Sequence, residues 1–340
     1  MAKVTLQAAR IAGIATAVPA RRFDNLKDTT AFDPAEVQKV TKMAGVAARH
    51  VADEATCSSD LCDAAAERLL SAIGWEAASV DALLFVTQTP DYIMPSSACL
   101  LHQRLRLSDR CAAFDVGLGC SGYPYGLWLA TMMLQTGSAR RVLLLHGETP
   151  TRYALESDRS VSLLFGDAGS ATALETAQNA GAWHFVLHTD GGGANDLIIE
   201  GGGFRNRFPA DSRLHYVSMQ GANVFNFTLQ RVPVLIEDTL TLAGLARDQV
   251  DYYIFHQANQ FIMKHLLQKA GLAPDRVPFI LKEYGNTGGP SVPLTLTQGG
   301  LARAADRPMR LMLLGYGVGL SWGSAVVDLA PDAPLLHVEK

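Results

Sequence analysis

Short, nearly continuous apolar runs alternate with helical patterns along this chain. The runs cover residues 80–86, 111–116, 141–147, 250–255 and 309–315, and segments with a helical apolar period or polar turns separate them. Strands that are apolar on both sides are typical of sheets whose two faces are covered by helices. The pattern therefore predicts an α/β fold with largely parallel sheets.

The same pattern occurs twice. The strand that begins at Val80 returns at Val250, an offset of 170 (250 − 80), and each follows a helical segment. The strand that ends at Gly147 corresponds to the one that ends at Gly315, an offset of 168 (315 − 147). Such a repeat predicts two similar units side by side. We place the first half at residues 1–178 and the second at 179–340, joined within the polar stretch 175–182.

Composition and charge restrict the possible partners. The chain has 340 residues, 48% of them hydrophobic, and a net charge of −4 without a long run of Lys or Arg. Neither nucleic acid nor an anionic membrane surface is therefore predicted as a partner. The apolar start of the chain is interrupted by Gly13 and Pro19, which argues against a signal peptide or a membrane span. We expect a cytoplasmic protein.

Two other kinds of site are not indicated. The five cysteines are an odd number without CxxC spacing, so neither a disulfide framework nor a zinc or other metal site is predicted. The Gly-rich segment 190–203 is not clearly followed by a helix and contains no Lys-Ser/Thr pair, so we expect a mobile surface loop rather than a phosphate-binding P-loop.

Cys120 is the first candidate for chemistry. It follows an apolar strand and the turn Gly117-Leu118-Gly119, and a helical pattern begins directly after it. Unpaired backbone amides and the positive end of the helix dipole make a thiol at a helix start easier to ionise. A lone cysteine among glycines is more often a small buried apolar residue. The nucleophile hypothesis therefore depends on what accompanies Cys120.

Two residues of the second half accompany it. His256 ends the strand 250–255, and the ends of parallel strands are where α/β proteins gather their active sites, although a histidine there can also be a structural hydrogen-bonding residue. Asn286 lies in the Gly-rich turn GNTGGPS, where asparagine is by default a turn residue. Under the duplication, however, Asn286 corresponds to Cys120, at an offset of 166 (286 − 120). We predict that Cys120, His256 and Asn286 share one cavity.

With these residues identified, the chain resembles the β-ketoacyl-acyl-carrier-protein synthase III branch of the thiolase superfamily. The motifs are GCSG around Cys120, HQAN from His256, GNTGGPSVP around Asn286, LFGDAGSA at 164–171 and GLSWGSAVV at 319–327, and they cover essentially the whole chain. The resemblance implies a five-layered α-β-α-β-α sandwich, a homodimer, and a Cys-His-Asn triad that performs decarboxylative Claisen condensation.

The resemblance also implies a role for each residue. Cys120 accepts an acyl group from a thioester, and the backbone N–H groups of Cys120 and Val318 hold the tetrahedral oxyanion. His256 Nε2–H and the Asn286 amide donate to the enolate that forms when a malonyl carrier-protein thioester loses CO2. The resemblance implies that no metal or redox cofactor is required, and that acyl-coenzyme A, acyl-carrier protein or both serve as substrates.

Substrate recognition departs from the family pattern. Lys39 and Met43 occupy the places of the Trp and Arg with which the family grips the adenine of coenzyme A, and Phe261 replaces an Arg used for carrier-protein docking. Arg159 matches a family Arg near the coenzyme phosphates. We therefore expect an acyl group on a carrier protein to be preferred over free acyl-coenzyme A.

Two further residues are expected near the substrate. Met94 stands where the family lends a residue across the dimer interface to the end of the acyl tunnel, and Asn259 closes the HQAN motif. The resemblance places both with Arg159 and Phe261 among the substrate-binding residues.

Other functions compete with this interpretation. A papain-like hydrolase has the same order of Cys, His and Asn, but its CGSCW-type motif and disulfides are missing here. A catalytically silent partner subunit would not need to keep all three residues. Within the superfamily, an acyltransferase or condensing enzyme of secondary metabolism, which transfers the acyl group to another acceptor, stays open.

Overall fold

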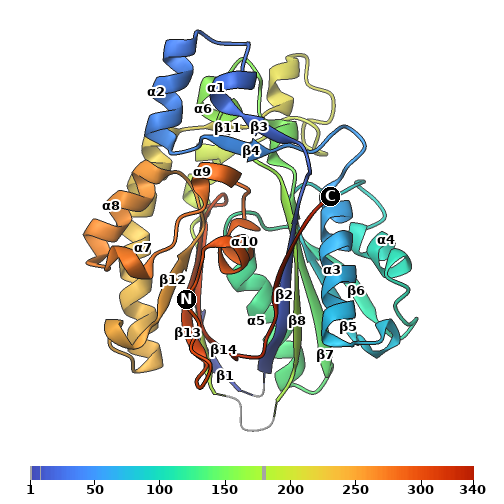
Figure 1. Ribbon diagram of the computed structural model, residues 1–340. Coiled ribbons are helices and arrows are strands. Elements are labelled where there is room, and N and C mark those ends of the chain that lie inside the picture. The colour runs from blue at the N-terminus through green and yellow to red at the C-terminus, as the bar shows by residue number, and fades with distance from the viewer. Residues whose placement is uncertain (1, 8, 178–180) are drawn as a thin grey trace.

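The computed structural model describes residues 2–7, 9–177 and 181–340, so the predicted boundary between residues 178 and 179 lies outside the described residues and stays a prediction. Two β-sheets lie face to face with helices between and outside them (Figure 1). The first sheet has the order β15 (Leu335–Glu339), β2 (Ala9–Val18), β8 (Ala168–Thr176), β7 (Arg141–Glu148), β5 (Ala82–Val86) and β6 (Ala112–Val116). The second has the order β1 (Ala2–Leu6), β9 (Trp183–Thr189), β14 (Ser321–Leu329), β13 (Met309–Gly317) and β12 (Tyr252–Phe255).

The helices complete five layers (Figure 1). The central layer contacts both sheets and contains α5 (Gly122–Gln135) and α10 (Ser291–Gln298). The outer face of the first sheet is covered by α3 (Ser58–Ile73) and α4 (Ser97–Arg104), and that of the second by α7 (Gly221–Ala243) and α8 (Gln260–Ala270). The predicted α-β-α-β-α sandwich is therefore confirmed.

Short elements gather toward one end of the molecule (Figure 1). They are α1 (Asn25–Asp28), α2 (Pro34–Ala44), α6 (Arg159–Ser162), α9 (Leu281–Tyr284), the ribbon of β3 (Arg22–Asp24) with β4 (Ala48–His50), and the ribbon of β10 (Leu197–Ile198) with β11 (Ser218–Met219). These segments surround the end at which α5 and α10 begin.

The two sheets repeat one arrangement of four strands. The order β2-β8-β7-β5 in the first sheet corresponds to β9-β14-β13-β12 in the second. In each set the first two pairings are antiparallel and the third is parallel. The expectation of largely parallel sheets is wrong for the second sheet, where β12 with β13 is the parallel pair and the other pairs are antiparallel. An apolar run buried on both faces looks the same in either direction, so the sequence pattern did not reveal this.

The terminal strands connect the two halves. β1 pairs with β9 in the second sheet, whereas β15 pairs in parallel with β2 in the first. The largest apolar cluster lies between the sheets and joins side chains of both, such as Leu84 and Leu313, to Tyr123 and Leu127 of α5. Because this cluster supports the starts of α5 and α10, their positions are fixed relative to each other.

Candidate active site

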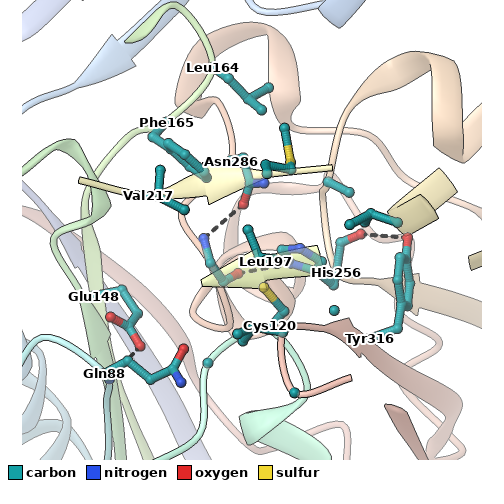
Figure 2. A pocket seen from close by; sticks show the side chains of 18 of the residues that line it. Gln88, Cys120, Glu148, Leu164, Phe165, Leu197, Val217, His256, Asn286 and Tyr316 are labelled. Carbon is teal, nitrogen blue, oxygen red and sulfur yellow. Dashed lines mark hydrogen bonds between the residues drawn. The ribbon is translucent and has the colours of Figure 1, made fainter. Parts of the chain in front are cut away.

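A cavity of about 410 Å³ opens where the two central helices begin. Figure 2 shows the side chains of Cys120, His256 and Asn286 converging on it from separate segments. The lining also includes Gln88, Glu148, Tyr153, Leu197, Ile198, Val217, Tyr316, Gly317 and Val318. Cys120, His256 and Asn286 therefore line one cavity, as the sequence predicts.

Cys120 lies between the end of β6 and the start of α5. Strand β6 ends at Val116, Ser121 precedes the helix, and Gly122 is its first residue. Gly317 of β13 lies directly against the cysteine, because a Cβ added there would be 2.8 Å from the Cys120 Cβ and 3.0 Å from its Sγ. Gly317 also has a φ of 154°, which favours glycine. A side chain at position 317 would therefore displace the sulfur.

The ionisation of Cys120 differs from the sequence-based prediction. Burial raises the pKa of its thiol to about 11, although the backbone N–H groups of Val318 and of Cys120 itself act in the opposite direction. Sequence reasoning considered the helix start but not the depth of the sulfur, and removal from water disfavours the thiolate. The thiol is therefore protonated at neutral pH. The two amides that face its sulfur are the pair predicted for the oxyanion hole.

His256 follows β12 and is almost fully buried. Its Nδ1 lies 3.0 Å from the Gly288 carbonyl oxygen and 2.9 Å from Ser291 Oγ, and the Tyr316 hydroxyl donates to its backbone carbonyl at 3.0 Å. Burial lowers the pKa of His256 to about 4. The imidazole is therefore neutral at pH 7, and its Nε2 is left for the cavity.

Asn286 is held by both its backbone and its side chain. Its backbone N–H donates to the Leu164 carbonyl at 2.9 Å, and its carbonyl accepts from the Gly166 N–H at 3.1 Å. Its Oδ1 accepts from the Gly288 N–H at 2.9 Å. This bond fixes the orientation of the amide and leaves its NH2 group as a donor for the cavity.

The predicted substrate residues are more dispersed. Asn259 lines the cavity, but its Oδ1 also accepts from the Ile262 N–H at 2.8 Å and caps α8. Phe261 is 47% exposed, lies outside the lining and stacks on Phe225 with ring centroids 5.4 Å apart. The cap on α8 accounts for the position of Asn259 without a substrate.

Arg159 and Met94 also lie outside the lining of the cavity. Arg159, on α6, forms an ion pair with Glu36 of α2, the helix that also carries Lys39 and the exposed Met43. Met94 is 80% exposed. Within this chain alone, neither residue contacts the space around Cys120.

The Gly-rich segment contributes to the cavity wall. A 3-10 turn covers Gly191–Asp196 and leads into β10, whose Leu197 and Ile198 line the cavity. The prediction of a mere surface loop is therefore wrong in this part. Apolar residues within a Gly-rich stretch, here LII at 197–199, were the available signal.

Sequence reasoning missed Glu148 and Ser291. Glu148 ends β7, is 1% exposed, and accepts from Gln88 N–H at 2.8 Å and Thr89 Oγ1 at 2.9 Å. Burial raises its pKa to about 8. The duplication offered a signal for Glu148, because it follows Gly147 as Tyr316 follows Gly315, and both residues line the cavity.

No cluster of three or more His, Cys, Asp or Glu residues suited to a metal occurs within residues 2–7, 9–177 and 181–340. In that same part of the chain, no helix has the length and apolar character needed to cross a membrane.

Comparison with known proteins identifies the family. Two family models match: 3-oxoacyl-[acyl-carrier-protein] synthase III at residues 114–191, and the C-terminal part of the same synthase at residues 240–329. A β-ketoacyl-[acyl-carrier-protein] synthase III of Neisseria meningitidis serogroup C is 32% identical over 323 residues, which cover 95% of this chain and 100% of that protein.

Solved structures agree with the sequence comparison. A 3-oxoacyl-(acyl-carrier protein) synthase from Burkholderia xenovorans LB400 is 44% identical with a TM-score of 0.96, and the match covers 100% of this chain and 99% of that one. The synthase III from Pseudomonas aeruginosa PAO1 is 29% identical with a TM-score of 0.84, covering 95% of this chain and 99% of that one. The predicted resemblance is confirmed: the chain belongs to the 3-oxoacyl-[acyl-carrier-protein] synthase III family of condensing enzymes in the thiolase superfamily.

Proposed function

We propose that Cys120 takes an acyl group from a thioester and that the acyl enzyme then condenses with a malonyl carrier-protein thioester. One observation carries this assignment: a thiol, an imidazole and a primary amide from three separate segments line one cavity. In the first step the acyl–sulfur bond of the donor breaks, a bond to Cys120 Sγ forms, and the thiol proton leaves with the donor's sulfur.

The backbone amides of Cys120 and Val318 hold the oxyanion of this step. Both N–H groups act on the Cys120 sulfur, which supports this role, because the carbon that the sulfur attacks would lie next to them. Loss of one such donor typically costs about 3 kcal/mol of transition-state stabilisation.

His256 and Asn286 act in the second step. The bond between the malonyl carbon and CO2 breaks, and its electrons form an enolate whose oxygen accepts hydrogen bonds from the imidazole and the amide. The enolate carbon then attacks the acyl group, and Cys120 leaves as a thiolate. A neutral His256 suits this role, because the step needs a donor and not a positive charge.

The acyl donor is proposed to arrive on a carrier protein. Lys39 and Met43 cannot form an adenine sandwich of aromatic ring and guanidinium, and the charge of Arg159 is already paired with Glu36. Stacking of a base on an aromatic side chain contributes about 1–3 kcal/mol, so its loss should raise the KM for free acyl-coenzyme A. Because Phe261 replaces an Arg, docking of the carrier protein should depend less on charge and therefore less on salt concentration.

A homodimer in the cytoplasm is part of this proposal. Strand β6 lies at the edge of its sheet with Phe114 41% exposed, and Tyr92, Ile93 and Met94 are more than 60% exposed nearby in sequence. An open edge with apolar side chains supports a second copy as its partner, and that copy would receive Met94.

Intact-protein mass spectrometry tests the assignment directly. The native protein should gain one acyl group from an acyl thioester, and Cys120→Ala should gain none. Cys111→Ala is the matched control, because Cys111 lies outside the lining of the cavity. An adduct of native yield on Cys120→Ala would refute the nucleophile, and a native protein that takes the acyl group but leaves malonyl carrier protein unchanged would refute the condensation. The same acyl chain on coenzyme A and on carrier protein, compared at low and high salt, decides the donor.

A further inference from the structure

The position of the imidazole proton on His256 depends on what faces its Nδ1. Two groups do: the Gly288 carbonyl oxygen at 3.0 Å and Ser291 Oγ at 2.9 Å. A carbonyl only accepts, so pairing with it requires a proton on Nδ1 and leaves Nε2 bare. A hydroxyl can donate, which leaves Nδ1 as the acceptor and puts the proton on Nε2.

The Ser291 hydroxyl has a choice of two acceptors. Ser291 is the first residue of α10 and is fully buried. Its Oγ accepts from the Gln257 N–H at 3.1 Å and, in the orientation found here, donates to the Gly288 carbonyl oxygen at 2.6 Å. That carbonyl also accepts from the Ser291 N–H at 3.2 Å. The hydroxyl can therefore turn to His256 without leaving the carbonyl unpaired.

The condensation requires one of the two tautomers. Burial keeps His256 neutral at pH 7, so the ring carries a single proton. An enolate oxygen in the cavity can accept a hydrogen bond from the ring only if that proton is on Nε2. Among the groups at hydrogen-bonding distance from Nδ1 in the described part of the chain, only the Ser291 hydroxyl favours this form.

We propose that Ser291 is a positioning residue whose hydroxyl donates to His256 Nδ1 and so keeps the proton on Nε2 for the malonyl enolate. This inference rests on the proposed role of His256 as an enolate donor. The same loop orients the other donor, because the Gly288 N–H holds Oδ1 of Asn286. The turn that precedes α10 thus determines which atoms of His256 and Asn286 act as hydrogen-bond donors toward the cavity.

Neighbouring groups keep the pH response of His256 simple. The titratable side chains around it are Cys120 before α5, His146 and Glu148 on β7, and Tyr316 on β13. Burial raises the pKa of Cys120, Glu148 and Tyr316, to about 11 and about 8 for the first two, and lowers that of His146 to about 3. All four are therefore mainly neutral between pH 4 and pH 7, where His256 takes up its second proton.

Ser291→Ala separates the two half-reactions. With only the Gly288 carbonyl left at Nδ1, the proton moves to Nδ1 and Nε2 cannot donate. Decarboxylation of malonyl carrier protein should fall about 10²-fold, close to the cost of losing a whole oxyanion donor. Acylation of Cys120, measured by mass spectrometry, should change by less than about threefold, because it does not use this donor. Ser291→Thr, which keeps the hydroxyl, should restore decarboxylation.

Thr295→Val is the matched control. Thr295 is also buried in α10, and its hydroxyl donates to the Ser291 carbonyl at 2.7 Å without contacting His256. This variant removes a buried hydroxyl one turn away and should leave both half-reactions near native rates. A loss equal to that of Ser291→Ala would mean that general damage to α10 explains the effect.

The pH profile distinguishes a tautomer effect from a structural one. Protonated imidazole carries a proton on both nitrogens, so the defect of Ser291→Ala relative to the native enzyme should shrink as the pH falls from about 7.5 to about 5. A defect of constant size across this range would overturn the inference.

Nitrogen-15 NMR of histidine-labelled protein gives a readout that needs no turnover. The His256 signals, assigned by their loss in His256→Ala, should report a protonated Nε2 in the native protein and a protonated Nδ1 in Ser291→Ala. A protonated Nδ1 in the native protein, or the same tautomer in both, overturns the inference. If the tautomer switches but the native protein does not decarboxylate malonyl carrier protein, the proposed function fails and the role of Ser291 in setting the tautomer stands.

Discussion

Replacing Glu148 with Gln should stabilise the protein at neutral and alkaline pH. Glu148 is 1% exposed, and burial raises its pKa to about 8 even though Gln88 N–H and Thr89 Oγ1 donate to its carboxylate. Gln has the same shape, and its amide can accept from Gln88 and donate to Thr89. The substitution therefore removes a titratable proton while the packing is kept.

The size of the effect follows from the two pKa values. Below pH 4.5, the ordinary value, the carboxyl is protonated in the folded and the unfolded chain, and ionisation has no effect on stability. Above it the unfolded chain ionises first, so folding stability falls as the pH rises toward 8. The two pKa values differ by 3.5 (8 − 4.5), so ionisation of Glu148 lowers the free energy of unfolding by about 5 kcal/mol above pH 8 and by about 3 kcal/mol at pH 7.

Urea and thermal unfolding at several pH values measure this difference. Glu148→Gln should unfold near the native temperature at pH 5 and about 5 °C above it at pH 8. Glu156→Gln, a charge removal at an exposed surface position, is the control and should follow the native profile at every pH. Parallel profiles for the native protein and Glu148→Gln would show that the carboxyl is not held protonated, and a less stable variant at pH 8 would refute the reasoning.

Three further results are expected. His256→Ala and Asn286→Ala should each reduce malonyl decarboxylation by about 10²–10³ while Cys120 is still acylated, and native decarboxylation rates in both variants would remove the two donors from the mechanism. Gly317→Ala should abolish acylation in a folded protein, because its Cβ would lie 2.8 Å from that of Cys120; an acylation rate near native would show that the strand can move aside. Met94→Trp should shorten the accepted acyl chain if a partner copy receives this side chain, and an unchanged chain-length profile would exclude it.

The sequence pattern located elements better than it oriented them. The strand predicted at 250–255 is Tyr252–Phe255, and the one predicted at 141–147 is Arg141–Glu148, so position was accurate to within two residues. The direction of the strands was not predicted correctly, because an apolar run has the same pattern when it is read from either end. The exchange of β1 and β15 between the sheets was equally hidden, since pairing is decided by tertiary contacts that a local pattern does not contain.

The duplication was the strongest guide to the site. An offset of 166 between Cys120 and Asn286 placed them at equivalent points, and both in fact precede a central helix at the same cavity. Glu148 was missed because an acidic residue after an apolar run is normally a solvated strand end. Its burial depends on Gln88 and Thr89, which lie about 60 residues earlier in the chain.

The ionisation of Cys120 shows where local reasoning reaches its limit. The start of α5 and two backbone amides favour the thiolate, whereas the surrounding apolar cavity disfavours it, and burial is the larger effect. In the proposed mechanism, the same amides hold the oxyanion that develops on a bound thioester. The thiol of the free protein is uncharged at neutral pH. In the proposed mechanism, the amides that would stabilise a thiolate instead stabilise the transition state of acyl transfer. Catalysis therefore needs no permanently charged sulfur, provided that the proton can leave as the thioester binds.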